Sequence, residues 1–139
     1  MADSEITGER RGATLSTARR PVFFDLFRLQ FPVGSIASFL HRVSGVLLIL
    51  SLPFLVSAFE RSLSGPEQFS VLAGALGSPL AKLLLIVLAW ALGHHIFAGI
   101  RHLLMDGGVG WQLRRARRSA SIVIVAGIVV AVIFAALIV

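Results

Sequence analysis

The sequence predicts an all-α integral membrane protein with three transmembrane helices. Apolar residues make up 56% of the 139 residues and charged residues only 14%, whereas soluble domains contain about 45–50% apolar residues and about 25% charged ones. Charge is absent from residues 43–59, 83–100 and 119–139, and about 20 residues of helix cross a hydrocarbon core. Helices are expected because every backbone polar group in lipid must be satisfied within the protein, and the chain has too few segments for a closed barrel.

The elements follow in order along the chain. Residues 1–34 form an N-terminal segment with an interfacial helix, because phenylalanines and leucines between 23 and 31 are interrupted by polar residues. The first transmembrane helix covers 35–61. A connection over 62–78 contains Ser-Gly-Pro-Glu at 64–67, a pattern that begins a short surface helix. The second transmembrane helix covers 79–104, and Ser78 and Pro79 form its cap and first turn.

A basic loop over 105–117 leads to the third transmembrane helix, at 118–139. In this helix Gly127, Ala131 and Ala135 recur every four residues, a spacing of small residues that lets helices approach closely in lipid. We expect the third helix to serve packing only.

Positive charge indicates the orientation. Arginines cluster before the first transmembrane helix and between the second and third, whereas Arg61 and Lys82 in the first connection are balanced by Glu60 and Glu67. Lys and Arg mark cytoplasmic segments, so the N-terminus is expected in the cytoplasm and the C-terminus and the 62–78 connection in the periplasm. The excess of basic residues is therefore explained by the orientation of the chain in the membrane, and we expect no nucleic-acid partner. The N-terminus has no secretory h-region, and a bacterial inner membrane is the expected location.

Ionisable and polar side chains inside two of the helices indicate a binding site, because such groups are costly at membrane depth. They are Ser38, His41 and Arg42 in the first helix and His94, His95, Arg101 and His102 in the second. The two helices run in opposite directions, yet both sets lie in the cytoplasmic half. A single site shared by the two helices would require their polar side chains to lie at the same depth. With no cysteine in the chain, thiolate metal sites and covalent c-type haem are excluded.

Simpler interpretations compete with a binding site. An intramembrane histidine can bond a neighbouring helix, and Arg101 is expected to snorkel toward the interface. His94 lies about 100° around the helix from His95, so both cannot face one iron atom. We assign His94 to packing.

Two segments resemble signatures of the succinate dehydrogenase cytochrome b family. Residues 35–45, Ser-Ile-Ala-Ser-Phe-Leu-His-Arg-Val-Ser-Gly, resemble Ser-x-x-x-His-Arg-x-(Ser/Thr)-Gly. Residues 95–106, His-Ile-Phe-Ala-Gly-Ile-Arg-His-Leu-Leu-Met-Asp, are similar to His-x-x-x-Gly-(Ile/Leu)-Arg-His-(Leu/Met)-x-x-Asp. Both occur in the expected helices, and the resemblance extends from about residue 20 to the end.

The resemblance implies one half of a heterodimeric helical membrane anchor. Its partners would be a second anchor subunit, an iron–sulfur subunit and a flavoprotein subunit. His95 would be an axial ligand of haem b, which the two anchor subunits share, and His41, Arg42 and His102 would lie near the haem or its propionates. Ser38 and Arg42 would help to bind ubiquinone. The complex would pass electrons from succinate to ubiquinone, with no succinate-oxidising site on this chain.

Three alternatives remain open at this point. A fumarate reductase anchor has the same architecture, runs in the opposite direction and can use menaquinone. A haem-free structural anchor would use its histidines only to bridge helices. A small transporter subunit is the third, although repeated broken helices and chains of acidic residues, which mark ion paths, are not evident.

Overall fold

A computed structural model describes residues 33–110 and 112–139. Its helices are α1 (Val33–Leu63), α2 (Pro66–Leu76), α3 (Pro79–Asp106) and α4 (Leu113–Ile138). α1, α3 and α4 are long and apolar enough to cross a membrane, and no strand occurs in the described ranges. The prediction of an all-α membrane protein with three spanning helices is confirmed. The predicted interfacial helix before α1 falls outside the described residues.

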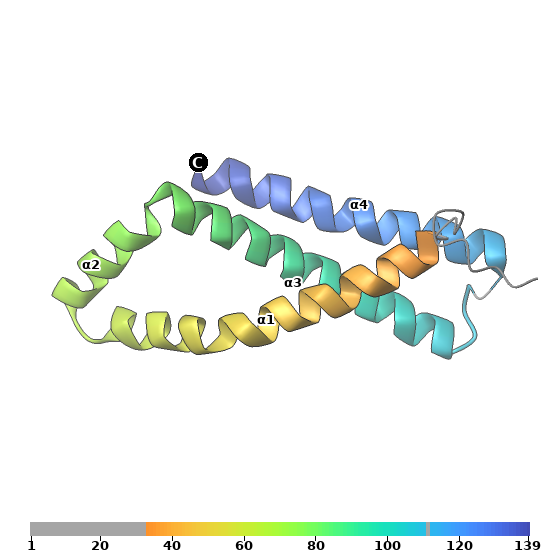
Figure 1. Cartoon of the computed structure of the whole chain (residues 1–139), viewed down its shortest axis with the longest axis horizontal. Coiled ribbons are helices and arrows are strands. Elements are labelled where there is room, and N and C mark those ends of the chain that lie inside the picture. Colours follow the sequence, from red (N-terminus) through yellow and green to blue (C-terminus); the bar gives the residue numbers. More distant parts are fainter. Residues whose placement is uncertain (1–32, 111) are drawn as a thin grey trace, which may run out of the picture.

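The three long helices lie side by side, and α2 connects the end of α1 to the beginning of α3 (Figure 1). The beginning of α1, the end of α3 and the beginning of α4 lie at the same end of the bundle. α1 lies across α3 at that end and diverges from it toward α2. The polar residues of α1 and α3 therefore lie in the half of the bundle in which these two helices meet.

The limits of α2 and α3 follow from their capping residues. Gly65 precedes α2 with a φ of 118°, a left-handed conformation that glycine adopts without a Cβ clash, and Pro66 begins the helix. The Ser78 side chain accepts a hydrogen bond from the backbone N–H of Ala81 at 3.3 Å, and Pro79 occupies the first helical position. The predicted short helix and the predicted cap of α3 are thus both present.

α4 begins five residues earlier than the third transmembrane helix predicted from the sequence, at Leu113 instead of 118. The backbone N–H of Ala116 already donates to the Gln112 carbonyl at 2.8 Å. Arginine is a good helix former, so the end of the predicted basic loop joins the helix. α1 is likewise two residues longer at each end than the predicted 35–61, and α3 ends at Asp106 instead of 104.

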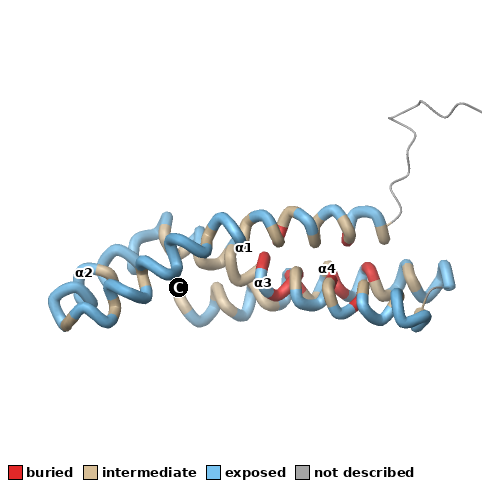
Figure 2. The backbone as a smooth tube through the Cα atoms, turned by 90° about the horizontal axis from the view of Figure 1, so that it is seen from below, coloured by how far each residue is buried: buried red, intermediate tan, exposed pale blue. Residues whose placement is uncertain are grey.

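Few of the described residues are buried within the single chain, and they lie in α1, α3 and α4 where these helices approach one another (Figure 2). Most are small, which lets the helix backbones approach one another. Large apolar side chains are instead exposed at the surface of the single chain. The buried residues are Ala37, Ser44, Ala91, Gly93, His94, Ala98, Arg101, Ala120, Val123 and Gly127.

Glycines on both helices allow the close contact between α3 and α4. A Cβ atom added at Gly93 would lie 2.9 Å from a side-chain atom of Val130, and one added at Gly127 would lie 2.9 Å from the His94 Cβ. The predicted small-residue stripe of the third transmembrane helix is therefore a contact surface at Gly127. Neither position has room for a side chain unless the helices move apart.

We expect Gly127→Ala to destabilise the bundle by about 1–3 kcal/mol, the usual cost of overpacking. Gly74→Ala in α2 is the control, because nothing lies within 4 Å of a Cβ added there. The measurement is the temperature at which each purified protein loses helical circular dichroism in detergent. Equal midpoints for the two variants would show that Gly127 is not a contact point.

Candidate functional site

Three histidines from α1 and α3 lie together in the half of the bundle where these helices meet. The rings of His41 and His95 stack with their centroids 4.2 Å apart and an angle of 27° between planes. The rings of His41 and His102 are 5.1 Å apart and tilted by 41°. His95 and His102 are two turns apart on α3, so His41 lies between them on the opposite helix. The predicted convergence of polar residues from the first and second transmembrane helices is confirmed for these three side chains.

His95 contacts the backbone of α1 through one ring nitrogen. Its Nδ1 lies 3.1 Å from the His41 carbonyl oxygen and 3.2 Å from the Ser44 hydroxyl oxygen. A carbonyl oxygen can only accept a hydrogen bond, so Nδ1 must carry the hydrogen when this contact forms. In the neutral ring the Nε2 atom then has a lone pair that can bind a metal.

Ser44 and Gly45 shape the surface of α1 on which the His95 ring lies. The Ser44 hydroxyl donates to the His41 carbonyl, one turn earlier in the same helix, at 2.8 Å. A Cβ atom added at Gly45 would lie 3.0 Å from the His95 Cε1, so the ring packs directly against the helix backbone. On α3, a Cβ at Gly99 would lie 3.7 Å from the His41 Nε2.

Ser38 and Arg42 occupy one face of α1, one helical turn apart. Ser38 is half-buried and Arg42 is exposed. Arg42 directly follows His41, so its backbone lies at the same level of α1 as the histidine cluster. A hydroxyl and a guanidinium on one face can both bond a polar group that approaches from outside the bundle.

His94 lies away from the cluster, between α3 and α4. It is fully buried, its ring stacks on that of Trp90 at 5.6 Å, and its Cβ lies beside Gly127. Neither ring nitrogen has a hydrogen-bond partner in the described part of the chain. The location agrees with the packing role expected for His94.

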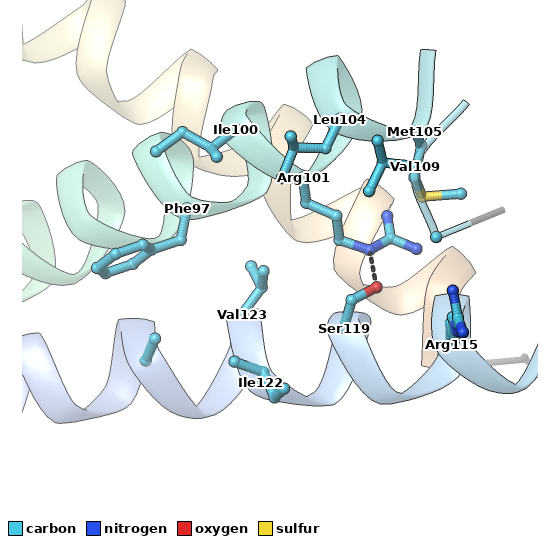
Figure 3. Close-up of a pocket in the computed structure, with 12 residues that line it drawn as sticks. Phe97, Ile100, Arg101, Leu104, Met105, Val109, Arg115, Ser119, Ile122 and Val123 are labelled. Carbon is cyan, nitrogen blue, oxygen red and sulfur yellow. Dashed lines mark hydrogen bonds between the residues drawn. The ribbon is translucent and has the colours of Figure 1, made fainter. Parts of the chain in front are cut away.

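Arg101 joins α3 to α4 (Figure 3). Its side chain is only 8% exposed. Its Nε donates to the Ser119 hydroxyl at 3.1 Å and its Nη2 to the Ala116 carbonyl at 3.2 Å. Oxygen atoms on α4 thus satisfy the guanidinium within the bundle, and its depth relative to the membrane interface stays a prediction. Arg101 and Ser119 border a cavity of about 370 Å³ with mainly apolar walls.

Sequence reasoning assigned no role to Ser44 or Gly45, although both fall within the first signature. A signal was present, since Ser44 is three residues after His41 and therefore lies on the same helix face. The described residues contain no group of three or more His, Asp or Glu side chains able to hold a bare metal ion. The histidine cluster can instead offer single imidazole ligands to a metal that carries other ligands of its own.

Removal of the Ser119 hydroxyl, which accepts a hydrogen bond from the Arg101 Nε, should weaken the contact between α3 and α4. We expect Ser119→Ala to lower the free energy of unfolding by about 1–3 kcal/mol, because a buried charged donor loses its acceptor. Ser121→Ala is the matched control, since that hydroxyl bonds only the Arg117 carbonyl of its own helix. Thermal unfolding of the detergent-solubilised protein measures the difference. Similar midpoints for the two variants would contradict the joining role of Arg101.

Comparison of the sequence with known proteins identifies its relatives. Residues 16–135 match the model of a family described as the succinate dehydrogenase/fumarate reductase transmembrane subunit. The match includes α1, α2 and α3 entirely and nearly all of α4. It therefore contains all the residues of the histidine cluster.

Individual relatives are similar in sequence over most of their length. The chain is 36% identical over 117 residues to a succinate dehydrogenase cytochrome b556 subunit from Coxiella burnetii, covering 84% of this chain and 94% of the relative. It is 27% identical over 121 residues to the corresponding subunit of Paracoccus denitrificans, covering 87% and 93%. A succinate dehydrogenase hydrophobic membrane anchor subunit from Halobacterium salinarum is 33% identical over 103 residues, covering 73% and 79%.

Proposed function

The chain belongs to the succinate dehydrogenase/fumarate reductase transmembrane subunit family, and we propose that it is the anchor subunit that binds haem b and ubiquinone. It is a multi-pass membrane protein of this family, and the proposed complex is a succinate dehydrogenase, as in its relatives. In the proposed reaction, electrons leave succinate in a flavoprotein subunit, pass through an iron–sulfur subunit and reduce ubiquinone in the membrane. The observation that carries the haem proposal is the contact of the His95 Nδ1 with the His41 carbonyl at 3.1 Å.

His95 has the chemistry expected of an axial haem ligand. The contact of Nδ1 with a carbonyl oxygen holds the proton on that atom and leaves the Nε2 lone pair for iron, an arrangement common among metal-binding histidines. One ring nitrogen from this chain fits a haem shared with a second anchor subunit, which would supply the other axial histidine. Haem with two histidine ligands supplies electron transfer without an open position for substrate.

His41 and His102 extend the haem site beyond His95, because His41 stacks on the His95 ring and His102 lies on the other side of His41. Their rings form one cluster with the proposed ligand, and imidazole N–H groups can donate hydrogen bonds to carboxylates such as haem propionates. The exposed Arg42 adds a positive charge at the same level of α1. These three side chains are proposed to bind or neutralise the propionates.

Ser38 and Arg42 are proposed to contribute to the ubiquinone site. The Ser38 hydroxyl can donate a hydrogen bond that orients the quinone ring. The Arg42 guanidinium can stabilise the negative charge that develops on a quinone oxygen during reduction, an effect that is strong where water is excluded. Residues of the second anchor and the iron–sulfur subunit would complete the pocket.

The proposed orientation places this site near the cytoplasmic surface of a bacterial inner membrane. The arginines at the beginning of α4 lie at the same end of the bundle as the beginning of α1 (Figure 1), as the positive-inside rule requires of a cytoplasmic end. Protons for quinone reduction would then come from cytoplasmic water. The C-terminus would be periplasmic.

Two narrower alternatives remain within the family. The family description includes fumarate reductase, in which the reaction runs in the opposite direction, and a haem-free anchor would keep the quinone role alone. The names of the three relatives favour succinate dehydrogenase, and two of them are cytochrome subunits. A reduced-minus-oxidised visible spectrum of the purified complex, together with its succinate-to-ubiquinone activity, tests both alternatives.

We expect His95→Ala to remove or strongly perturb the b-type haem spectrum of the assembled complex. His94→Leu is the matched control, because it retains side-chain volume at the adjacent position and removes ring nitrogens that have no hydrogen-bond partner. The measurement is haem content per complex, with assembly monitored by the presence of all subunits. An intact spectrum in His95→Ala would exclude this residue as a ligand.

We further expect Ser38→Ala and Arg42→Ala to lower succinate-to-ubiquinone activity, with a loss of about 100-fold for Arg42→Ala. Succinate oxidation by a soluble artificial acceptor should be unchanged, because that reaction bypasses the quinone. Ser57→Ala and Arg61→Ala, both at exposed positions farther along α1, are the controls. Parallel loss of both activities would indicate failed assembly and would not support a quinone site.

A further inference from the structure

We propose that Ser44 is a positioning residue for His95, whose Nδ1–H is held between the Ser44 hydroxyl and the His41 carbonyl. The proposal rests on the proposed role of His95 as a haem ligand and adds a second residue that acts through it. Its predicted effects are to fix the ring orientation and to make Nε2 a stronger electron donor. Ser44 itself would not contact the iron.

The direction of the hydrogen bonds follows from the Ser44 hydroxyl. Its single hydrogen is donated to the His41 carbonyl at 2.8 Å. Toward His95, at 3.2 Å, the hydroxyl oxygen can therefore only accept. The carbonyl, at 3.1 Å, can also only accept. Both partners thus require a proton on Nδ1, and both disfavour the tautomer in which Nε2 would carry the proton.

Burial makes this arrangement effective. Ser44 is fully buried, and hydrogen bonds are electrostatically stronger in such a low-dielectric environment than in water. The absence of a side chain at Gly45 lets the His95 ring lie against α1, since a Cβ there would be 3.0 Å from Cε1. α1 therefore supplies two acceptors and a close steric surface to a ligand carried by α3.

A second serine on α1 shows which part of the arrangement is specific. Ser51 donates to the Leu48 carbonyl at 2.8 Å, the same bond to the third preceding residue that Ser44 makes. This local bond is ordinary for serine in transmembrane helices. Among the hydrogen bonds of the described residues, only the Ser44 hydroxyl also meets a histidine ring. Ser51 is thus a matched control for loss of a hydroxyl and its local bond.

The consequence for haem follows from ligand basicity. Acceptors at Nδ1–H increase the electron density of the imidazole and the basicity of the coordinating nitrogen. A more basic ligand stabilises oxidised iron relative to reduced iron. Loss of the Ser44 acceptor should therefore raise the haem midpoint potential, while the His41 carbonyl still holds the ring.

The experiment compares Ser44→Ala, Ser44→Thr and Ser51→Ala with the wild type, each as the assembled complex. The measurements are haem content per complex and the haem midpoint potential from an optical redox titration. We expect Ser44→Ala to shift the potential upward and to lower haem affinity about tenfold. Ser44→Thr retains the hydroxyl and should restore the wild-type behaviour, and Ser51→Ala should match the wild type.

Each contrary result has a distinct meaning. If the wild-type complex contains haem but Ser44→Ala has an unchanged potential and haem affinity, the positioning role is overturned while the proposed function stands. Equal haem loss in Ser44→Ala and Ser44→Thr, with Ser51→Ala intact, would indicate that the site needs only the serine shape, and this also overturns the proposal. A wild-type complex without haem would overturn the proposed haem function and the positioning role together.

Discussion

The contact between the His95 ring and the backbone of α1 is the interaction on which the arrangement of polar residues depends. In a bundle surrounded by lipid, a polar group that finds no partner within the protein is costly. The His41 carbonyl and the Ser44 hydroxyl supply partners for Nδ1 in the register in which α3 packs against α1. In the same register the His41 ring stacks on His95 and lies 5.1 Å from the tilted His102 ring.

The contact of α3 with α4 has a different physical character. Gly93 and Gly127 remove the side chains that would separate these helices, and Arg101 bonds two oxygen atoms of α4 at one end. α3 therefore directs its polar cluster toward α1 and its tightest packing toward α4. His94, adjacent to His95 in sequence, belongs to the second surface, which explains why two consecutive histidines have such different surroundings.

The sequence was sufficient to predict the helices and the convergence of histidines from α1 and α3, but not the internal geometry of the site. Charge-free lengths identified the three spanning helices, and Ser78 with Pro79 identified the beginning of α3. Helical periodicity places residues on a face but does not determine which atom of a neighbouring helix that face meets. The bonds of Ser44 and Arg101 therefore could not be predicted, because both depend on the rotation that packing gives to each helix. The assigned ligand roles concern groups outside this chain and stay predictions.

The local hydrogen bond of Ser44 also matters while the protein is being synthesised and inserted into the membrane. His95 follows His41 by 54 residues, an interval of a few seconds at about 5–20 residues per second of translation. α1 must spend that interval without its later partner. Because the Ser44 hydroxyl already donates to the His41 carbonyl within α1, its hydroxyl hydrogen is satisfied before α3 is made. α1 can thus lie in the bilayer without α3 at little energetic cost. When α3 inserts, the His41 carbonyl and the Ser44 hydroxyl accept hydrogen bonds from His95.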